Sequence, residues 1–236
     1  MEINADTLLT GLLWFLVFCF STTCHEAAHA WAALRLGDST AYQAGQVSLS
    51  PLPHIRREPF GMVFMPILSF LLSGWMLGWA SAPYDPIWSH TYPRRSAWMS
   101  LAGPAANFVL MLFAGLVIRL LYTAGLATLQ PSHSLAHLIV ANGALAASGF
   151  GTGLMAILSI LFTLNLLLFV FNLLPVPPLD GSGAVMLLMP ESAARRYQEV
   201  LFTQPFLAMA GLVLAWKFGG PLLTRALLLG ITLLFA

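Results

Sequence analysis

The chain alternates between long apolar stretches and short polar connections. A helix needs about 20 residues to cross a bilayer, and apolar stretches near this length occur at residues 7–34, 59–82, 97–122, 152–174, 200–218 and 221–236. Pro66 and Ser73-Gly74 interrupt the second stretch, and Gly219-Gly220-Pro221 separate the last two. The pattern predicts an all-α polytopic membrane protein with about five or six membrane segments.

The connection after the first stretch has a different pattern. Residues 40–50 alternate between polar and apolar side chains around Gly45, which is typical of a short β-hairpin. We therefore expect a small β-hairpin or sheet inserted after the first helix. Residues 123–149 are mostly small and polar, which indicates an external loop.

The basic residues predict the orientation of the chain. Seven of its ten Lys and Arg residues lie in three connections, at Arg35, Arg56, Arg57, Arg94, Arg95, Arg195 and Arg196. Short cytoplasmic connections are enriched in such residues, so we expect these three connections inside and the N-terminus outside. Residues 59–82 then either form a re-entrant hairpin that turns near Ser73-Gly74, or cross once while another segment does not.

Composition supports a membrane protein. Hydrophobic residues make up 58% of the chain and charged residues 8%, against about 25% charged in ordinary soluble domains. The formal net charge of +1 argues against a nucleic-acid partner. The N-terminus has neither a basic region nor a cleavage site after the first stretch, so we expect a retained span and not a signal peptide.

The first apolar stretch contains the polar motif His25-Glu26-Ala27-Ala28-His29. Side chains four residues apart share one face of a helix, so His25 and His29 can direct two imidazoles at one point. Glu26 can reach a water molecule bound to a metal there, as the general base of a zinc hydrolase does. Ionisable groups are costly inside a bilayer and mark functional sites. The motif predicts a protease whose active site lies within the membrane.

A catalytic zinc site takes three protein ligands, and Asp180 is the candidate for the third. It follows the fourth apolar stretch at the predicted cytoplasmic end, at a depth similar to that of the two histidines. The alternative is that Asp180 only caps the helix expected to start near Ser182, because Asp is a favoured N-cap residue.

Three motifs, in this order, resemble the site-2 protease family of intramembrane zinc metalloproteases, and its compact bacterial branch in particular. They are His25 through His29, Ala102 through Asn107, and Asn172 through Gly181. The resemblance implies an endopeptidase acting on transmembrane protein substrates. It also implies one Zn²⁺ per chain, held by His25, His29 and Asp180, with Glu26 as the general base.

The same resemblance suggests a role for Asn172, which matches a family position thought to contact the substrate or the oxyanion. The alternative is that Asn172 pairs with backbone groups freed by Pro175 and Pro177. Gly103, Pro104 and Asn107 are interpreted as residues that let helices pack closely beside the site.

The expected hairpin offers an edge with which an extended substrate strand could pair. Val47 and Leu49 are therefore candidate substrate-binding residues. His54 is a third candidate, the alternative being a solvated side chain at the membrane interface. Ser50 stands where the bacterial branch commonly has Asn, and Ile55 follows His54 where an acidic residue is usual, so the role of this loop departs from the family pattern.

We expect a single intramembrane metalloprotease domain over residues 1–236, with a catalytic core at about 7–190 and C-terminal membrane segments at about 200–236. An inactive scaffold or binding protein on the same fold is the alternative, and the complete set of Glu26 and three ligands argues against it. A transporter would be expected to show an internal repeat, and none is visible. The lack of Asn-X-Ser/Thr sequons fits a bacterial inner membrane.

Overall fold

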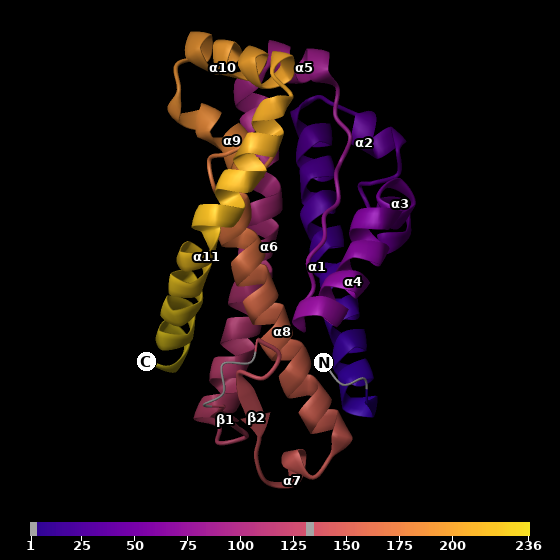
Figure 1. The fold of residues 1–236 in the computed structure, drawn as a ribbon, viewed down its shortest axis with the longest axis vertical. Coiled ribbons are helices and arrows are strands. Elements are labelled where there is room, and N and C mark those ends of the chain that lie inside the picture. The colour runs from indigo at the N-terminus through magenta and orange to yellow at the C-terminus, as the bar shows by residue number, and fades with distance from the viewer. Residues whose placement is uncertain (1–3, 131–134) are drawn as a thin grey trace.

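The computed structural model describes residues 4–130 and 135–236. Within these residues, four helices are long and apolar enough to cross a membrane: α1 (Ala5–Leu36), α6 (Pro93–Thr123), α8 (Gly149–Asn172) and α11 (Phe206–Phe235). α6 packs against α1 and α8, and α11 packs against α8 (Figure 1). The predicted all-α polytopic membrane fold is confirmed, but with four spans where five or six were expected.

The four spans differ in how much the rest of the chain covers them. In α8, 61% of the most apolar window is buried, whereas in α11 the share is 11%. The main core lies where α1, α6 and α8 meet, around Trp14, Phe18 and Ile160. α8 is therefore the central helix, and α11 is the peripheral one.

Residues 60–82 form a hairpin and not a span. η1 (Phe60–Phe64, a π-helical turn) continues into α4 (Met65–Ser73), and Gly74 reverses the chain with a φ of 78°. Residues 75–85, the return segment, contain no helix or strand. The Trp79 N–H donates to the Gly61 carbonyl (3.1 Å). Figure 1 shows this return running from the end of α4 up to α5 (Pro86–Thr91). The re-entrant alternative therefore describes this segment.

The last two apolar stretches also differ from the prediction. Residues 200–203 belong to α10 (Glu191–Thr203), an amphipathic helix at the upper end of the molecule in Figure 1. Gly219-Gly220-Pro221 do not separate two spans, because α11 continues through them as one helix. A proline is tolerated inside a membrane helix where local adjustments satisfy the freed backbone groups. The two predicted segments thus contain one span.

The β-hairpin predicted at residues 40–50 is wrong. Thr40–Gln43 form the short helix α2. Asp38 Oδ1 starts this turn by accepting from the Thr40 N–H (2.9 Å) and hydroxyl (2.6 Å). Gly45 follows with a φ of 73°, and α3 (Pro51–Arg57) completes the connection. Local bonds from side chain to backbone override the alternating pattern here.

A small two-stranded antiparallel sheet is present in a different loop. β1 (Ala127–Leu129) pairs with β2 (Ile139–Ala141), with Thr128 opposite Val140. This sheet and α7 (Gly143–Ala146) occupy the connection expected to be external, between α6 and α8. At the other end of the molecule, α9 (Asp180–Ala184) and η2 (Val185–Leu188) link α8 to α10.

Candidate metal centre

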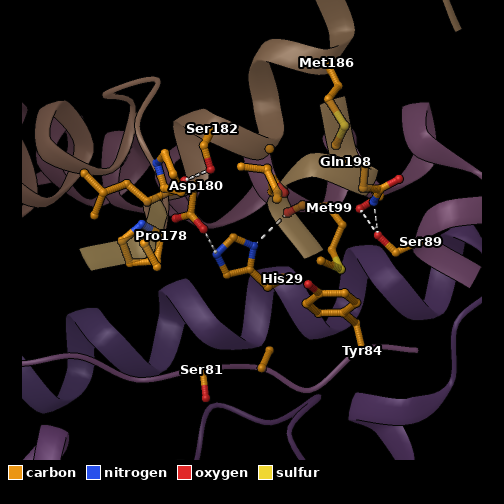
Figure 2. A pocket seen from close by; sticks show the side chains of 18 of the residues that line it. His29, Ser81, Tyr84, Ser89, Met99, Pro178, Asp180, Ser182, Met186 and Gln198 are labelled. Carbon is orange, nitrogen blue, oxygen red and sulfur yellow. Dashed lines mark hydrogen bonds and ion pairs between the residues drawn. The ribbon is translucent and has the colours of Figure 1, made fainter. Parts of the chain in front are cut away.

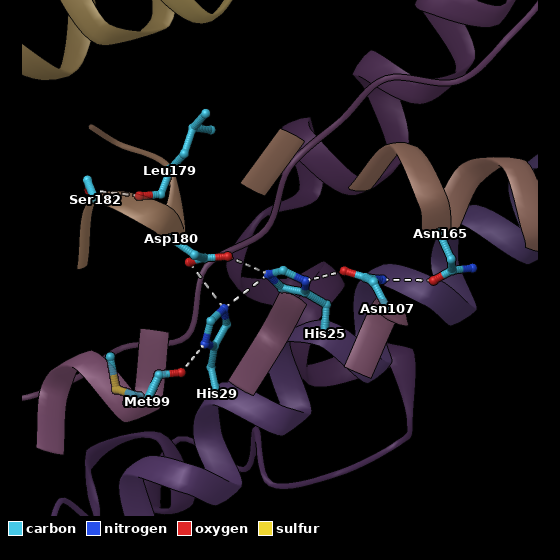
Figure 3. A network of polar contacts seen from close by, with 8 residues as sticks. All are labelled: His25, His29, Met99, Asn107, Asn165, Leu179, Asp180 and Ser182. Carbon is cyan, nitrogen blue, oxygen red and sulfur yellow. Dashed lines mark hydrogen bonds and ion pairs between the residues drawn. The ribbon is translucent and has the colours of Figure 1, made fainter. Parts of the chain in front are cut away.

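Two histidines from α1 meet one aspartate from the start of α9 (Figure 3). The Nε2 atoms of His25 and His29 lie 3.0 Å apart. Asp180 Oδ2 is 3.0 Å from His25 Nε2, and Asp180 Oδ1 is 3.3 Å from His29 Nε2. Both histidines are buried, and Asp180 is partly buried. The predicted meeting of these three side chains is therefore present in the structure.

The chain after α8 brings Asp180 back to α1. α8 ends at Asn172, and turns lead to α9, whose N-cap residue is Leu179. A Cβ at Gly181 would collide with the carbonyls of Leu173 and Leu174, so the close return requires glycine there. Because Leu179 occupies the N-cap position and the carboxylate of Asp180 faces the histidines, the capping alternative for Asp180 is excluded.

Each histidine is oriented from behind by a hydrogen bond. His29 Nδ1 lies 2.7 Å from the Met99 carbonyl, which can only accept, so the His29 proton is on Nδ1. His25 Nδ1 bonds Asn107 Oδ1. Asn107 Nδ2 donates to Asn165 Oδ1 (2.8 Å), which directs Asn107 Oδ1 toward His25 as the acceptor. Both Nε2 atoms therefore present lone pairs to the centre.

This arrangement fits a zinc ion. Two lone pairs and two carboxylate oxygens face one another at distances of 3.0–3.3 Å, and without a cation they would repel. Ligand atoms around tetrahedral zinc lie about 3.3 Å apart, as follows from bond lengths of about 2.0–2.2 Å. Asp180 Oδ2 is buried and has no hydrogen-bond partner, which is costly for a carboxylate oxygen unless a metal binds it. Two imidazoles and one carboxylate form a known ligand set of catalytic zinc sites, which leaves a position open for water.

Two asparagines behind the site have a larger role than the sequence indicated. Asn107, interpreted as a packing residue, is fully buried and holds His25. Asn165, which the sequence interpretation did not single out, is also fully buried, and its Nδ2 donates to Ser21 Oγ (2.9 Å) and the Leu161 carbonyl (2.8 Å). The available signal was an amide side chain in the middle of the mostly apolar α8, where polar groups are costly.

The packing role expected for Gly103 is confirmed. A Cβ at this position would overlap with the Nε2 atoms of His25 and His29. Glycine thus lets α6 approach α1 directly over the metal-binding atoms.

Glu26 lines a cavity of about 390 Å³. Figure 2 shows His29 and Asp180 on the wall of the same cavity. Its walls come from residues 80–84, α6, α9, α10 and the start of α11. A polar corner is formed where Gln198 Nε2 donates to Ser89 Oγ, which in turn bonds Ser96 Oγ (2.7 Å). Burial raises the pKa of Tyr84 on this wall, so its hydroxyl stays neutral. The cavity therefore places the carboxylate of Glu26 and two of the candidate metal ligands, His29 and Asp180, beside open space.

The other predicted site residues lie apart from this cavity. Asn172 is the last residue of α8, is partly exposed, and does not line the cavity. Val47 is partly exposed and Leu49 is 69% exposed, in a loop without the expected strand edge. His54 is buried, with Nε2 3.1 Å from the Ser48 carbonyl, so a solvated position for His54 is wrong. The structure therefore brings together four of the predicted residues, His25, Glu26, His29 and Asp180.

Comparison with known proteins gives one family and several relatives. Residues 13–216 match the model of peptidase family M50. YwhC of Bacillus subtilis, named as a zinc metalloprotease, is 30% identical over 203 residues, which cover 83% of this chain and 80% of YwhC. Rip2 of Mycobacterium tuberculosis strain Erdman, also named as a zinc metalloprotease, is 30% identical over 210 residues, which cover 87% of this chain and 68% of Rip2. No solved structure matches the chain.

Proposed function

The chain belongs to peptidase family M50, the site-2 protease family, and from this premise we propose that it cleaves peptide bonds of membrane-spanning protein substrates within the bilayer. As a member it is a zinc metalloprotease, and its four apolar spans make it an integral membrane protein. The observation that carries the proposal is the position of Glu26 beside His25, His29 and Asp180. The two histidines and Glu26 belong to a membrane-spanning helix and are all buried.

The mechanism assigns each side chain one task. His25, His29 and Asp180 would hold the ion, and zinc bound there would supply a Lewis acid that polarises the scissile carbonyl and makes water a stronger acid. Glu26 accepts the proton of the attacking water and then donates it to the nitrogen of the leaving amine. Met99 and Asn107 keep the imidazoles in the tautomer that leaves each Nε2 free.

A substrate helix has to unwind before its peptide bond can reach these groups. With no strand edge at residues 40–50, the extended residues 80–84 take that role in our proposal, because they line the same cavity as Glu26. Among the described residues, the N–H groups of residues 80, 81, 82 and 84 have no hydrogen-bond acceptor. An unwound substrate segment would supply acceptors by pairing as an added strand.

The proposed orientation has the N-terminus outside and the active site toward the cytoplasm of a bacterial inner membrane. It is supported by the gathering of basic side chains at one end of the bundle. Arg95 donates to the Leu36 carbonyl (3.1 Å), and Arg195 donates to the Thr91 carbonyl (3.2 Å). These bonds tie together the ends of α1 and α5 and the starts of α6 and α10, at the top of Figure 1.

The proposal is tested with the purified protein in lipid vesicles that also contain single-span substrate proteins. We expect cleavage within the substrate span, identified by mass spectrometry of the fragments, and loss of cleavage in Glu26→Gln. Soluble peptides of the same sequence serve as the comparison. Cleavage confined to soluble peptides, with every membrane-embedded substrate intact, would contradict the proposal while leaving the zinc protease assignment unchanged.

A further inference from the structure

α11 has two basic side chains inside a span. Lys217 and Arg225 are both exposed, and neither forms an ion pair or hydrogen bond with any residue in the described ranges. The Lys217 ammonium lies 5.7 Å from the centre of the neighbouring Phe218 ring. No acidic residue occurs between residues 206 and 236. Two unpaired cations on a membrane helix need an explanation.

Both side chains point away from the bundle. Gly211, Ala215 and Gly219 are buried at four-residue spacing and mark the packed face of the first half of α11. In the second half Leu234 is buried. A rotation of about 100° per residue places Lys217 and Arg225 opposite the packed face of their respective halves. The two cations therefore face the surroundings of the protein and not its cavity.

The bilayer surface does not account for both cations. α11 has 30 residues and is therefore about 45 Å long, of which the hydrocarbon core takes up about 30 Å, or 20 residues. Lys217 and Arg225 are eight positions apart, about 12 Å. Any 20 consecutive residues of an upright α11 can lie in the hydrocarbon core. For every such choice, the Cα of Lys217 or of Arg225 lies about 9 Å or more from the nearer surface of the core. Reaching the headgroups from there requires a fully extended side chain.

We propose that the face of α11 formed by Lys217, Thr224 and Arg225 is a docking surface for a membrane-spanning helix of another protein that carries two carboxylates about two turns apart. Charge complementarity selects this partner, because ionisable groups inside membranes pair with one another. A second copy of the chain would bring Lys217 and Arg225 against like charges on the same face, which disfavours a symmetric dimer there. The low coverage of α11 by the rest of the chain leaves room for such a helix.

The test uses a synthetic host helix of Leu and Ala with two Glu residues seven positions apart, and a matched helix with Gln at both positions. Energy transfer between the labelled helix and the labelled full chain is measured in phosphatidylcholine vesicles, which carry no net charge. We expect the Glu helix to bind at least tenfold more tightly than the Gln helix. The double variant Lys217→Gln/Arg225→Gln should abolish this difference. The control Arg56→Gln/Arg196→Gln removes two exposed charges in α3 and α10, which are not spans, and should preserve it.

Equal binding of the Glu and Gln helices to the unaltered chain would overturn the proposal, and this comparison does not depend on any variant folding. A preference for Glu that persists in Lys217→Gln/Arg225→Gln would also overturn it. So would energy transfer between two labelled copies that is lost in this variant, because the face would then bind a second copy. A Glu preference that disappears when phosphatidylglycerol is added would assign the face to anionic lipid instead.

Discussion

At the scale of single residues, the site depends on amides that fix the histidines. Asn165 donates to Ser21 and Leu161, so its oxygen is the group left to accept from Asn107, and Asn107 in turn directs its oxygen at His25. A metal ligand held this way keeps its lone pair on the metal side, and loss of such a support commonly lowers metal affinity about 10- to 100-fold.

We therefore predict that Asn165→Leu lowers zinc affinity by about tenfold or more, although Asn165 is not itself a proposed ligand. Competition with a chromophoric chelator measures the affinity, and the spectrum of the cobalt-substituted protein reports the ligand geometry. Asn142→Leu, in the loop between β2 and α7, is the matched control and should bind zinc as the unaltered protein does. Equal zinc affinity in Asn165→Leu would show that Asn107 keeps its orientation without Asn165.

A second prediction concerns the approach of α6 to α1. Gly103→Ala adds a Cβ where the Nε2 atoms of His25 and His29 lie, so we expect zinc content to fall well below one per chain. Gly220→Ala is the control, because a Cβ at Gly220 meets no atom within 4 Å. Full zinc occupancy in Gly103→Ala would mean that α6 can move away without disturbing the ligands.

At the scale of secondary-structure elements, the sequence predicted correctly the helices whose ends are marked by polar or glycine residues. The prediction was wrong where hydrogen bonds from a nearby side chain override the pattern of polar and apolar residues. The fourth apolar stretch matches α8 within a few residues, and the first lies inside α1, because polar or glycine residues mark their ends. Residues 40–50 alternate like a strand, yet bonds from Thr40 to Asp38 start the helix α2 over the first four of them. Their pattern does not show that the Asp38 carboxylate is buried and bonded on both oxygens.

The part of the candidate site that depends on the spacing of residues within one helix could be predicted from the sequence. His25 and His29 are one helical turn apart, and this geometry holds in any helix. Asp180 could be proposed but not distinguished from a helix cap, because that choice depends on the fold of the turns before α9. Asn165 was missed because its partners come from other helices, and no spacing within α8 predicts them.

Asp38 offers a test of how the return segment is held. Its Oδ2 accepts from the Asp85 N–H (2.9 Å), while its Oδ1 accepts from the N–H and hydroxyl of Thr40 at the start of α2. Asp38→Ala should lower the free energy of unfolding by about 1–3 kcal/mol, because it leaves the partly buried donors of Thr40 and Asp85 without this acceptor. Unfolding in mixed detergent micelles gives this value, and Asp6→Ala, at an exposed position of α1, should change it little. A difference below about 0.5 kcal/mol would show that the return segment does not need this anchor.

The return segment itself is tested by Ala82→Pro, which removes a backbone N–H from the wall of the cavity. We expect slower cleavage of membrane substrates with unchanged zinc content, because the substrate strand loses one donor. Leu49→Pro, in the loop first expected to supply the edge, is the matched control and should cleave normally. Normal cleavage by Ala82→Pro together with slow cleavage by Leu49→Pro would contradict this prediction. The substrate would then pair with residues 40–50.

At the scale of the whole molecule, three packed spans carry the chemistry and the fourth is peripheral. The ligands come from α1 and from the start of α9, and α6 and α8 support the histidines from behind. α10 and the start of α11 complete the cavity on the proposed cytoplasmic side. Such a division lets α11 present its outer face to the membrane without disturbing the metal centre.

In the proposed site, His25, His29 and Asp180 hold one zinc ion, and Glu26 acts as the general base without binding the ion. The most direct measurement is the zinc content of the detergent-purified chain and of His25→Ala, Asp180→Ala and Glu26→Gln, made alongside a cleavage assay. We predict about one zinc per chain in the unaltered protein and in Glu26→Gln, little zinc in His25→Ala and Asp180→Ala, and cleavage by the unaltered protein alone. Full zinc content in Asp180→Ala would contradict it, because the third ligand would then be another residue.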